Sequence, residues 1–174
     1  MQAQALFGIS IVFSFIAWGT LIAHFVWSEL RGRSRLDALR PLLMLHGFRF
    51  VGLSFLIPGV VSPDLPLGFA APAAYGDIGA AILALLSLAM LRSNLAVPLV
   101  WTFNIWGSVD LVNAFYQGNA AGLLPGQLGA AFFIPTAIVP LLLITHGLML
   151  RLLLRREPAV PGATQRLFTA PTHG

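Results

Sequence analysis

An arginine and a histidine lie within one of the most apolar parts of the chain, the stretch LMLHGFRFVGLSFLIPG at residues 43–59. An ionised side chain inside a hydrocarbon layer costs between about 2.5 and more than 10 kcal/mol, so it normally faces other polar groups. Asp77 and Asp110 lie in two other apolar segments. We therefore predict that Arg49 pairs with a carboxylate, and favour Asp110 because it lies deeper in its segment.

The segment that contains Asp110 is the most polar of the apolar segments, since it also carries Asn104 and Asn113. At the rise of an α-helix, about 1.5 Å per residue, Asn104 is expected at the depth of Arg49. Titratable groups at successive depths in a membrane are what a proton or ion path requires. The predicted ligand or proton-path residues are thus Arg49, Asp110, Asp77, Asn104 and Asn113.

Three histidines are a second candidate for chemistry. The same estimate of depth places His24, His46 and His146 in one layer of three different segments. Imidazoles held together can bind a divalent metal or relay protons, and two histidines on facing helices can ligate haem b. His46 and His146 are each followed by glycine, which leaves room for a porphyrin edge, and Arg49, Arg151 or Arg155 would then meet its propionates.

Composition determines the environment in which these residues must work. The chain has 174 residues, of which 57% are hydrophobic and 9% charged, whereas a water-soluble domain is about 25% charged. There is no cysteine, which excludes disulfides, thiolate metal sites and cysteine nucleophiles. The formal charge of +4 comes from arginines that flank the apolar segments, so nucleic acid is not the expected partner.

Apolar runs of about 20 residues cross a bilayer as helices, and the sequence has five candidates. We predict an all-α integral membrane protein whose single domain, residues 1–156, is a bundle of five transmembrane helices. A disordered cytoplasmic tail is expected at 157–174, where the sequence is polar and contains proline and glycine. The predicted spans are about 5–27, 41–61, 75–91, 95–116 and 128–153.

The arginines predict the orientation of the bundle, because cytoplasmic loops are enriched in basic residues. In the five-span arrangement every flanking arginine falls on one side, so the N-terminus is expected outside and the C-terminus inside a multi-pass cell membrane of the bacterial inner-membrane type. The first three, Arg31, Arg33 and Arg35, are also expected to bind anionic lipid headgroups. The full set is Arg31, Arg33, Arg35, Arg40, Arg92, Arg151, Arg155 and Arg156.

The chain has no enzyme motif with a known mechanism, so a non-enzymatic function is favoured. The first hypothesis is a protein that binds or conducts a proton, small ion or solute through the polar cluster. A single chain of this size is small for alternating access, so a homo-oligomer is then expected. The alternatives are a bis-histidine haem protein, an accessory subunit of a larger membrane complex, and a metal-dependent enzyme acting on lipid or isoprenoid substrates.

Overall fold

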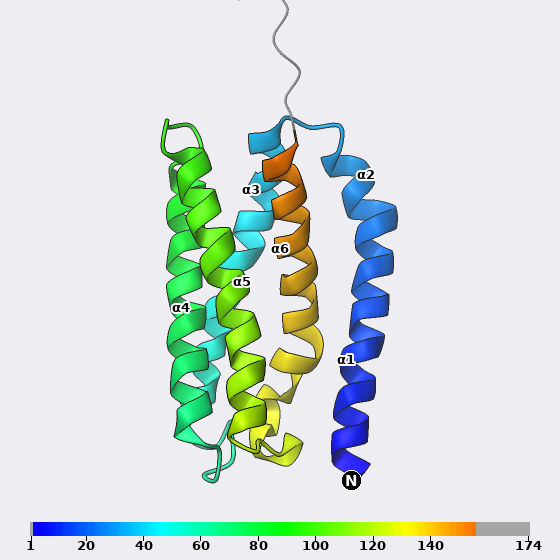
Figure 1. Ribbon diagram of the computed structural model, residues 1–174, viewed down its shortest axis with the longest axis vertical. Helices are drawn as coiled ribbons and strands as arrows, with labels where there is room; N and C mark the ends of the chain where they lie inside the picture. Colours follow the sequence, from blue (N-terminus) through cyan, green and yellow to red (C-terminus); the bar gives the residue numbers. More distant parts are fainter. Residues whose placement is uncertain (1, 156–174) are drawn as a thin grey trace, which may run out of the picture.

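The computed structural model describes residues 2–155, which form a bundle of long, nearly parallel helices (Figure 1). No β-strand occurs among these residues, so the prediction of an all-α fold is confirmed for them. The predicted tail at 157–174 lies outside the described residues.

Five helical segments run the length of the bundle (Figure 1). Several contain 3₁₀ or π-helical turns, which we label η. In chain order the first segment is α1 (Gln2–Leu21), η1 (Ile22–Val26) and α2 (Trp27–Leu30), and the second is α3 (Arg35–His46) and η2 (Gly47–Leu56). The third is α4 (Leu67–Ala89), the fourth is α5 (Ala96–Ala120), and the fifth is η3 (Pro125–Phe132), η4 (Ile134–Ile138) and α6 (Val139–Leu154).

Within residues 2–155, four of these stretches are both long enough and apolar enough to cross a membrane: Gln2–Leu30, Arg35–Leu56, Leu67–Ala89 and Ile134–Leu154. Helix α5 has 25 residues and is as long as its neighbours, but it carries more polar side chains. Length and composition therefore support four of the five predicted spans directly.

Two helices begin six to eight residues before the spans that were predicted within them. The second segment begins at Arg35 instead of Pro41, since Ser34 caps it: the Ser34 Oγ accepts from the Asp37 N–H at 3.3 Å and donates to the Asp37 carboxylate at 2.6 Å. The third begins at Leu67 instead of Tyr75, directly after Pro66. Asp77 consequently lies in the middle of α4 and not near its end.

The arginine-bearing connections all lie at one end of the bundle, which we call the arginine end. The α2–α3 connection, the α4–α5 turn and the last turn of α6 lie there, whereas the N-terminus lies at the opposite end (Figure 1). Two contacts tie this end together. Arg35 Nη2 donates to the Arg155 carbonyl at 2.6 Å, and Arg155 Nη1 donates to the Arg31 carbonyl at 2.9 Å.

The apolar interior consists of two clusters, one in each half of the bundle. The cluster at the arginine end includes Leu43, Ala84, Phe103 and Met149. The cluster at the opposite end includes Phe55, Phe69, Ala73, Leu111 and Leu142. On α4, α5 and α6 the residues between the two clusters include the buried polar ones, which places a polar layer across the middle of the bundle.

Candidate functional site

The backbone around Arg49 is a 3₁₀-helix of ten residues, η2, which follows the α-helical α3. Residues three apart eclipse one another in a 3₁₀-helix, and the buried residues of η2 are Arg49, Gly52 and Phe55. In an α-helix, Leu53 would continue the face of His46 and Arg49. Instead Leu53 is only partly buried, and Gly52 lies on the face that packs against α4.

Arg49 binds both aspartates, from two different helices. Its Nε donates to Asp77 Oδ1 at 2.7 Å, and its Nη2 donates to Asp110 Oδ2 at 2.6 Å. The third nitrogen, Nη1, donates to the carbonyl of Gly107 at 3.2 Å. The Arg49 side chain is 0% exposed, so its charge is compensated entirely within the protein. The predicted pairing thus has two carboxylates and not only the favoured Asp110.

Three glycines make this approach of the helices possible. A Cβ at Gly52 would collide with the Asp77 carboxylate, and one at Gly76 would collide with the Asp110 carboxylate. A Cβ at Gly107 would lie 2.6 Å from the His146 ring and 2.7 Å from Arg49 Nη1. Any larger residue at these positions would push the helices or the charged groups apart.

His146 extends the cluster towards the arginine end of the bundle. Arg49 Nη1 lies 3.4 Å from His146 Nε2, and His146 Nδ1 lies 2.9 Å from Asn104 Oδ1. Because a guanidinium nitrogen can only donate, Nε2 must accept, so the neutral ring carries its proton on Nδ1 and donates it to Asn104. Asn104 therefore fixes the tautomer of His146, and does not contact Arg49 itself.

His46 completes the polar layer and packs against His146 with ring centroids 4.2 Å apart. Its Nε2 lies 3.0 Å from the hydroxyl of Thr145. The Phe103 ring packs against both histidines. Its centroid lies 5.1 Å from the His46 ring centroid and 5.2 Å from the His146 ring centroid. His46 is 0% exposed, and its Nδ1 has no hydrogen-bond partner among residues 2–155.

Two predicted site residues lie away from this layer. His24 is exposed on η1, and Asn113 is exposed on α5, so neither faces the cluster. Within the described part of the chain, no group of three potential ligands is placed to hold a metal ion. Of the three histidines, His46 and His146 thus form a pair.

Gly52, Gly76 and Thr145 contribute to the site although they are not among the residues predicted from the sequence. The two glycines have a recognisable signal, since Gly76 adjoins Asp77 and Gly52 follows Arg49 at the 3₁₀ spacing. Glycine close to a charged residue in an apolar segment indicates that another helix or its side chain approaches there. Thr145 gives no such signal, because a single threonine is common in apolar helices.

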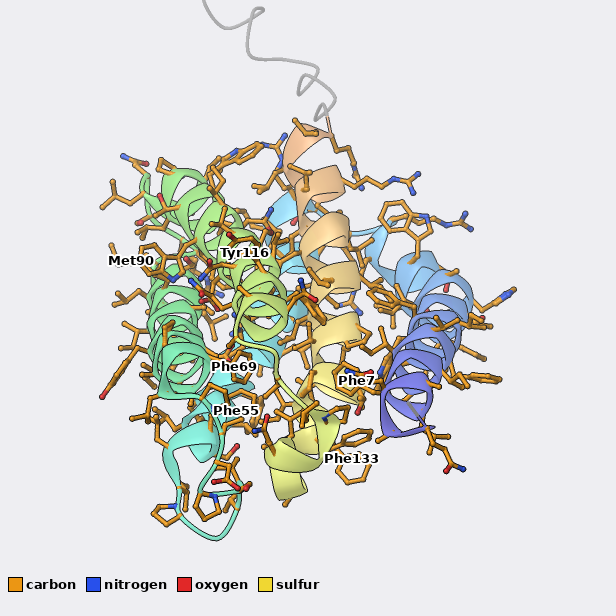
Figure 2. The ribbon with its side chains drawn as sticks, turned by 60° about the horizontal axis from the view of Figure 1, so that its bottom comes forward. Phe7, Phe55, Phe69, Met90, Tyr116 and Phe133 are labelled. Carbon is orange, nitrogen blue, oxygen red and sulfur yellow. The ribbon has the colours of Figure 1, made fainter. Side chains whose placement is uncertain are left out.

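A partly open cavity of ≈ 300 Å³ reaches the cluster from the opposite end of the bundle. Its charged lining residues are Asp77 and Asp110, and four of the other lining residues are aromatic: Phe7, Phe55, Phe69 and Phe115. Figure 2 shows Phe55 and Phe69 close together and Phe7 across from them on α1. The ring centroids of Phe55 and Phe69 lie 5.3 Å apart, and the two rings are edge to face. The cavity therefore joins an apolar chamber to the two carboxylates.

These features define a helical bundle with a buried guanidinium–carboxylate cluster at its centre and an apolar cavity leading to it. Residues 6–154 match the family described as Domain of unknown function (DUF8737). The match covers most of the chain, which therefore belongs to this family. No curated protein and no solved structure matches the chain.

Proposed function

We propose that the chain is an integral membrane protein with five crossings, with its N-terminus outside and its arginine end in the cytoplasm. Helix α5 is the fifth crossing: its 25 residues extend about 37 Å, and it runs beside α4 (Figure 1). Its lower hydropathy comes in part from Asn104, which is buried in the protein interior. The arginines at one end of the bundle support this orientation.

The function that the geometry supports best is binding of a proton or a small cation at the ion cluster, defined as Arg49, Asp77 and Asp110. The observation that carries the proposal is the ratio of charges: one guanidinium serves two carboxylates, which leaves a formal charge of −1 when all three are ionised. An uncompensated charge is expensive in a membrane interior. The cluster therefore favours one additional positive charge, either a proton on a carboxylate or a bound cation.

The two halves of the bundle differ in packing, and this difference favours binding of an ion at the cluster over its free conduction through the bundle. The cavity connects the carboxylates to the opposite end. Towards the arginine end, the packed apolar cluster that contains Leu43, Phe103 and Met149 follows directly after the histidine pair. A bound ion thus has an open route on one side, and conduction would require rearrangement of the other side.

Infrared spectroscopy of the protein reconstituted in lipid tests proton binding directly. During a pH titration of the wild type we expect a carboxyl band that belongs to the ion cluster. The band should be lost in Asp110→Asn and retained in Asp64→Asn, the matched control, because Asp64 is exposed in the loop before α4. If the titration of Asp110→Asn is the same as that of the wild type, the cluster does not bind the proton and the proposal fails.

Ion flux measured in the same proteoliposomes separates binding from conduction. We expect no proton flux above that of protein-free liposomes when a potential is applied. A flux that is present in the wild type and in Asp64→Asn but absent in Asp110→Asn would show instead that the cluster lies on a conducting path.

A further inference from the structure

The cavity next to the ion cluster has a strong asymmetry of charge. Asp77 and Asp110 line it, and their side chains are 10% and 12% exposed, whereas the side chain of Arg49 is 0% exposed and lies behind them. A molecule in the cavity therefore meets the negative groups of the cluster first. The end of the cavity at the cluster is suited to a positive charge.

Each carboxylate also has an oxygen to spare. Asp77 uses Oδ1 and Asp110 uses Oδ2 for Arg49, and within residues 2–155 no hydrogen bond is made to Asp77 Oδ2 or Asp110 Oδ1. Asp77 as a whole residue is only 7% exposed. Asp77 Oδ2 lies beside Gly52 and Asp110 Oδ1 beside Gly76. Both oxygens can still accept a hydrogen bond, and a ligand in the cavity can supply the donor.

The rest of the cavity is suited to an apolar body. Phe7, Phe55, Phe69 and Phe115 contribute to its wall, and aromatic faces attract organic cations as well as apolar groups. Its volume of ≈ 300 Å³ lies at the lower end of the range for small-molecule sites. Asn119 lies nine positions after Asp110 on α5, so the cavity extends about 13.5 Å along the helix.

The cavity has exposed lining residues on both α1 and α5. Gln4 on α1 and Asn119 on α5 both line the cavity and are exposed. Helix α1 packs against α6, η3 and η4 but makes few contacts with α5. In a membrane these two residues would face the outer interface, where amphiphilic molecules accumulate.

We propose that the cavity binds a small organic monocation, an amine or ammonium ion with an apolar body, whose charged group meets Asp77 and Asp110. This inference rests on the proposed function and specifies its ligand. The ammonium group would donate to the free carboxylate oxygens, and its charge would bring the cluster to neutrality. The apolar body would fill the aromatic part of the cavity towards Gln4 and Asn119.

Calorimetric titration with hexylammonium tests the proposal on the full chain in dodecyl maltoside, a detergent without charge. Hexanol and hexanoate, which share the apolar body, are the matched probes, and protein-free micelles provide the baseline. We expect wild type and Asp64→Asn to bind hexylammonium at least ten times more tightly than either matched probe. We expect Asp110→Asn to bind hexylammonium at least ten times more weakly than the wild type does.

A second variant, Ala114→Phe, fills the cavity without altering the ion cluster, because Ala114 lines the cavity one helical turn after Asp110. It should lose hexylammonium binding and keep the infrared carboxyl titration. The proposal is overturned if no protein binds hexylammonium above the baseline, if the three probes bind equally, or if Ala114→Phe binds as the wild type does. In each of these outcomes an intact carboxyl titration would leave proton binding by the cluster standing.

Discussion

The first and second helical segments differ in mean hydropathy and in burial. The relation between the two quantities is the opposite of that expected in a water-soluble bundle. Gln2–Leu30 has the highest mean hydropathy of the four apolar stretches, yet only 6% of its most apolar part is buried. Arg35–Leu56 has the lowest mean hydropathy, yet 39% of the corresponding part is buried, Arg49 and His46 included. In water the most apolar helix would be expected at the centre.

This difference supports the proposal that the protein lies in a membrane. Between helices in a bilayer, apolar side chains gain little by leaving the lipid, so close packing and polar contacts hold the bundle together. Helix α1 has no buried residue in Gln2–Leu21, whereas η2 packs closely along α4 through a glycine and the arginine. The comparison predicts that substitutions in the polar layer cost much and equivalent ones in α1 cost little.

The largest effect is expected from Arg49→Ala. It removes the cation shared by Asp77 and Asp110 and leaves two buried carboxylates without compensation, which costs about 3–5 kcal/mol. Unfolding of the protein in mixed micelles of dodecyl maltoside and dodecyl sulfate measures this free energy. The control is Arg92→Ala, at the exposed α4–α5 turn. A loss below about 1 kcal/mol, the value of an exposed ion pair, would contradict the central role of Arg49.

Gly107→Ala should destabilise the protein through steric collision. The added Cβ would lie 2.6 Å from the His146 ring and 2.7 Å from Arg49 Nη1, and overpacking of this kind costs about 1–3 kcal/mol. The same unfolding experiment measures the loss. If Gly107→Ala is as stable as the wild type, α5 and α6 are not packed as closely as described.

Thr145→Val tests the contact of the histidine pair with Thr145, because valine has a side chain of similar shape to that of threonine but no hydroxyl. The variant removes the partner of His46 Nε2, and a hydrogen bond between membrane helices contributes about 1 kcal/mol. Thr102→Val is the matched control, because Thr102 is exposed and its hydroxyl donates to the Pro98 carbonyl of its own helix. Equal stability of the two variants would show that the contact between His46 and Thr145 contributes nothing.

The smallest effect is expected in α1. Gly19→Ala introduces a Cβ with no atom within 4 Å, so it should change the free energy of unfolding by less than about 1 kcal/mol, with the sign favouring alanine because of its helix propensity. This substitution is the direct counterpart of Gly107→Ala. A large loss in Gly19→Ala would mean that another surface covers this face of α1.

Several features of the site follow from the residues alone. The charges of Arg49, Asp77 and Asp110 in apolar segments require partners, and this requirement predicts that Arg49 pairs with a carboxylate. The prediction favoured Asp110 over Asp77 because it began the third span at Tyr75. The helix starts at Leu67, which places Asp77 in mid-helix, where it is as good a partner as Asp110.

Other features depend on how each helix is rotated about its axis. Equal depth suggested that His24 joins His46 and His146, and Asn113 was predicted as a site residue because it lies in the same polar segment as Asp110. Depth follows from counting residues, but rotation follows from packing, and both His24 and Asn113 face outward. Local helix type matters in the same way, since the 3₁₀ geometry of η2 brings Gly52 to the face that α-helical spacing assigned to Leu53.

The sequence by itself determined that the chain is helical, that most of its segments have the length and apolarity of membrane spans, and that its few buried charges must meet. These properties are set by composition and by the cost of isolated charge, which act on each segment separately. The tertiary structure alone decided that one arginine serves two aspartates, that two histidines and not three form the neighbouring layer, and that an apolar cavity ends at the carboxylates. Those properties arise where several helices meet, and the angle at which each helix faces its neighbours is set by the side chains of all of them together.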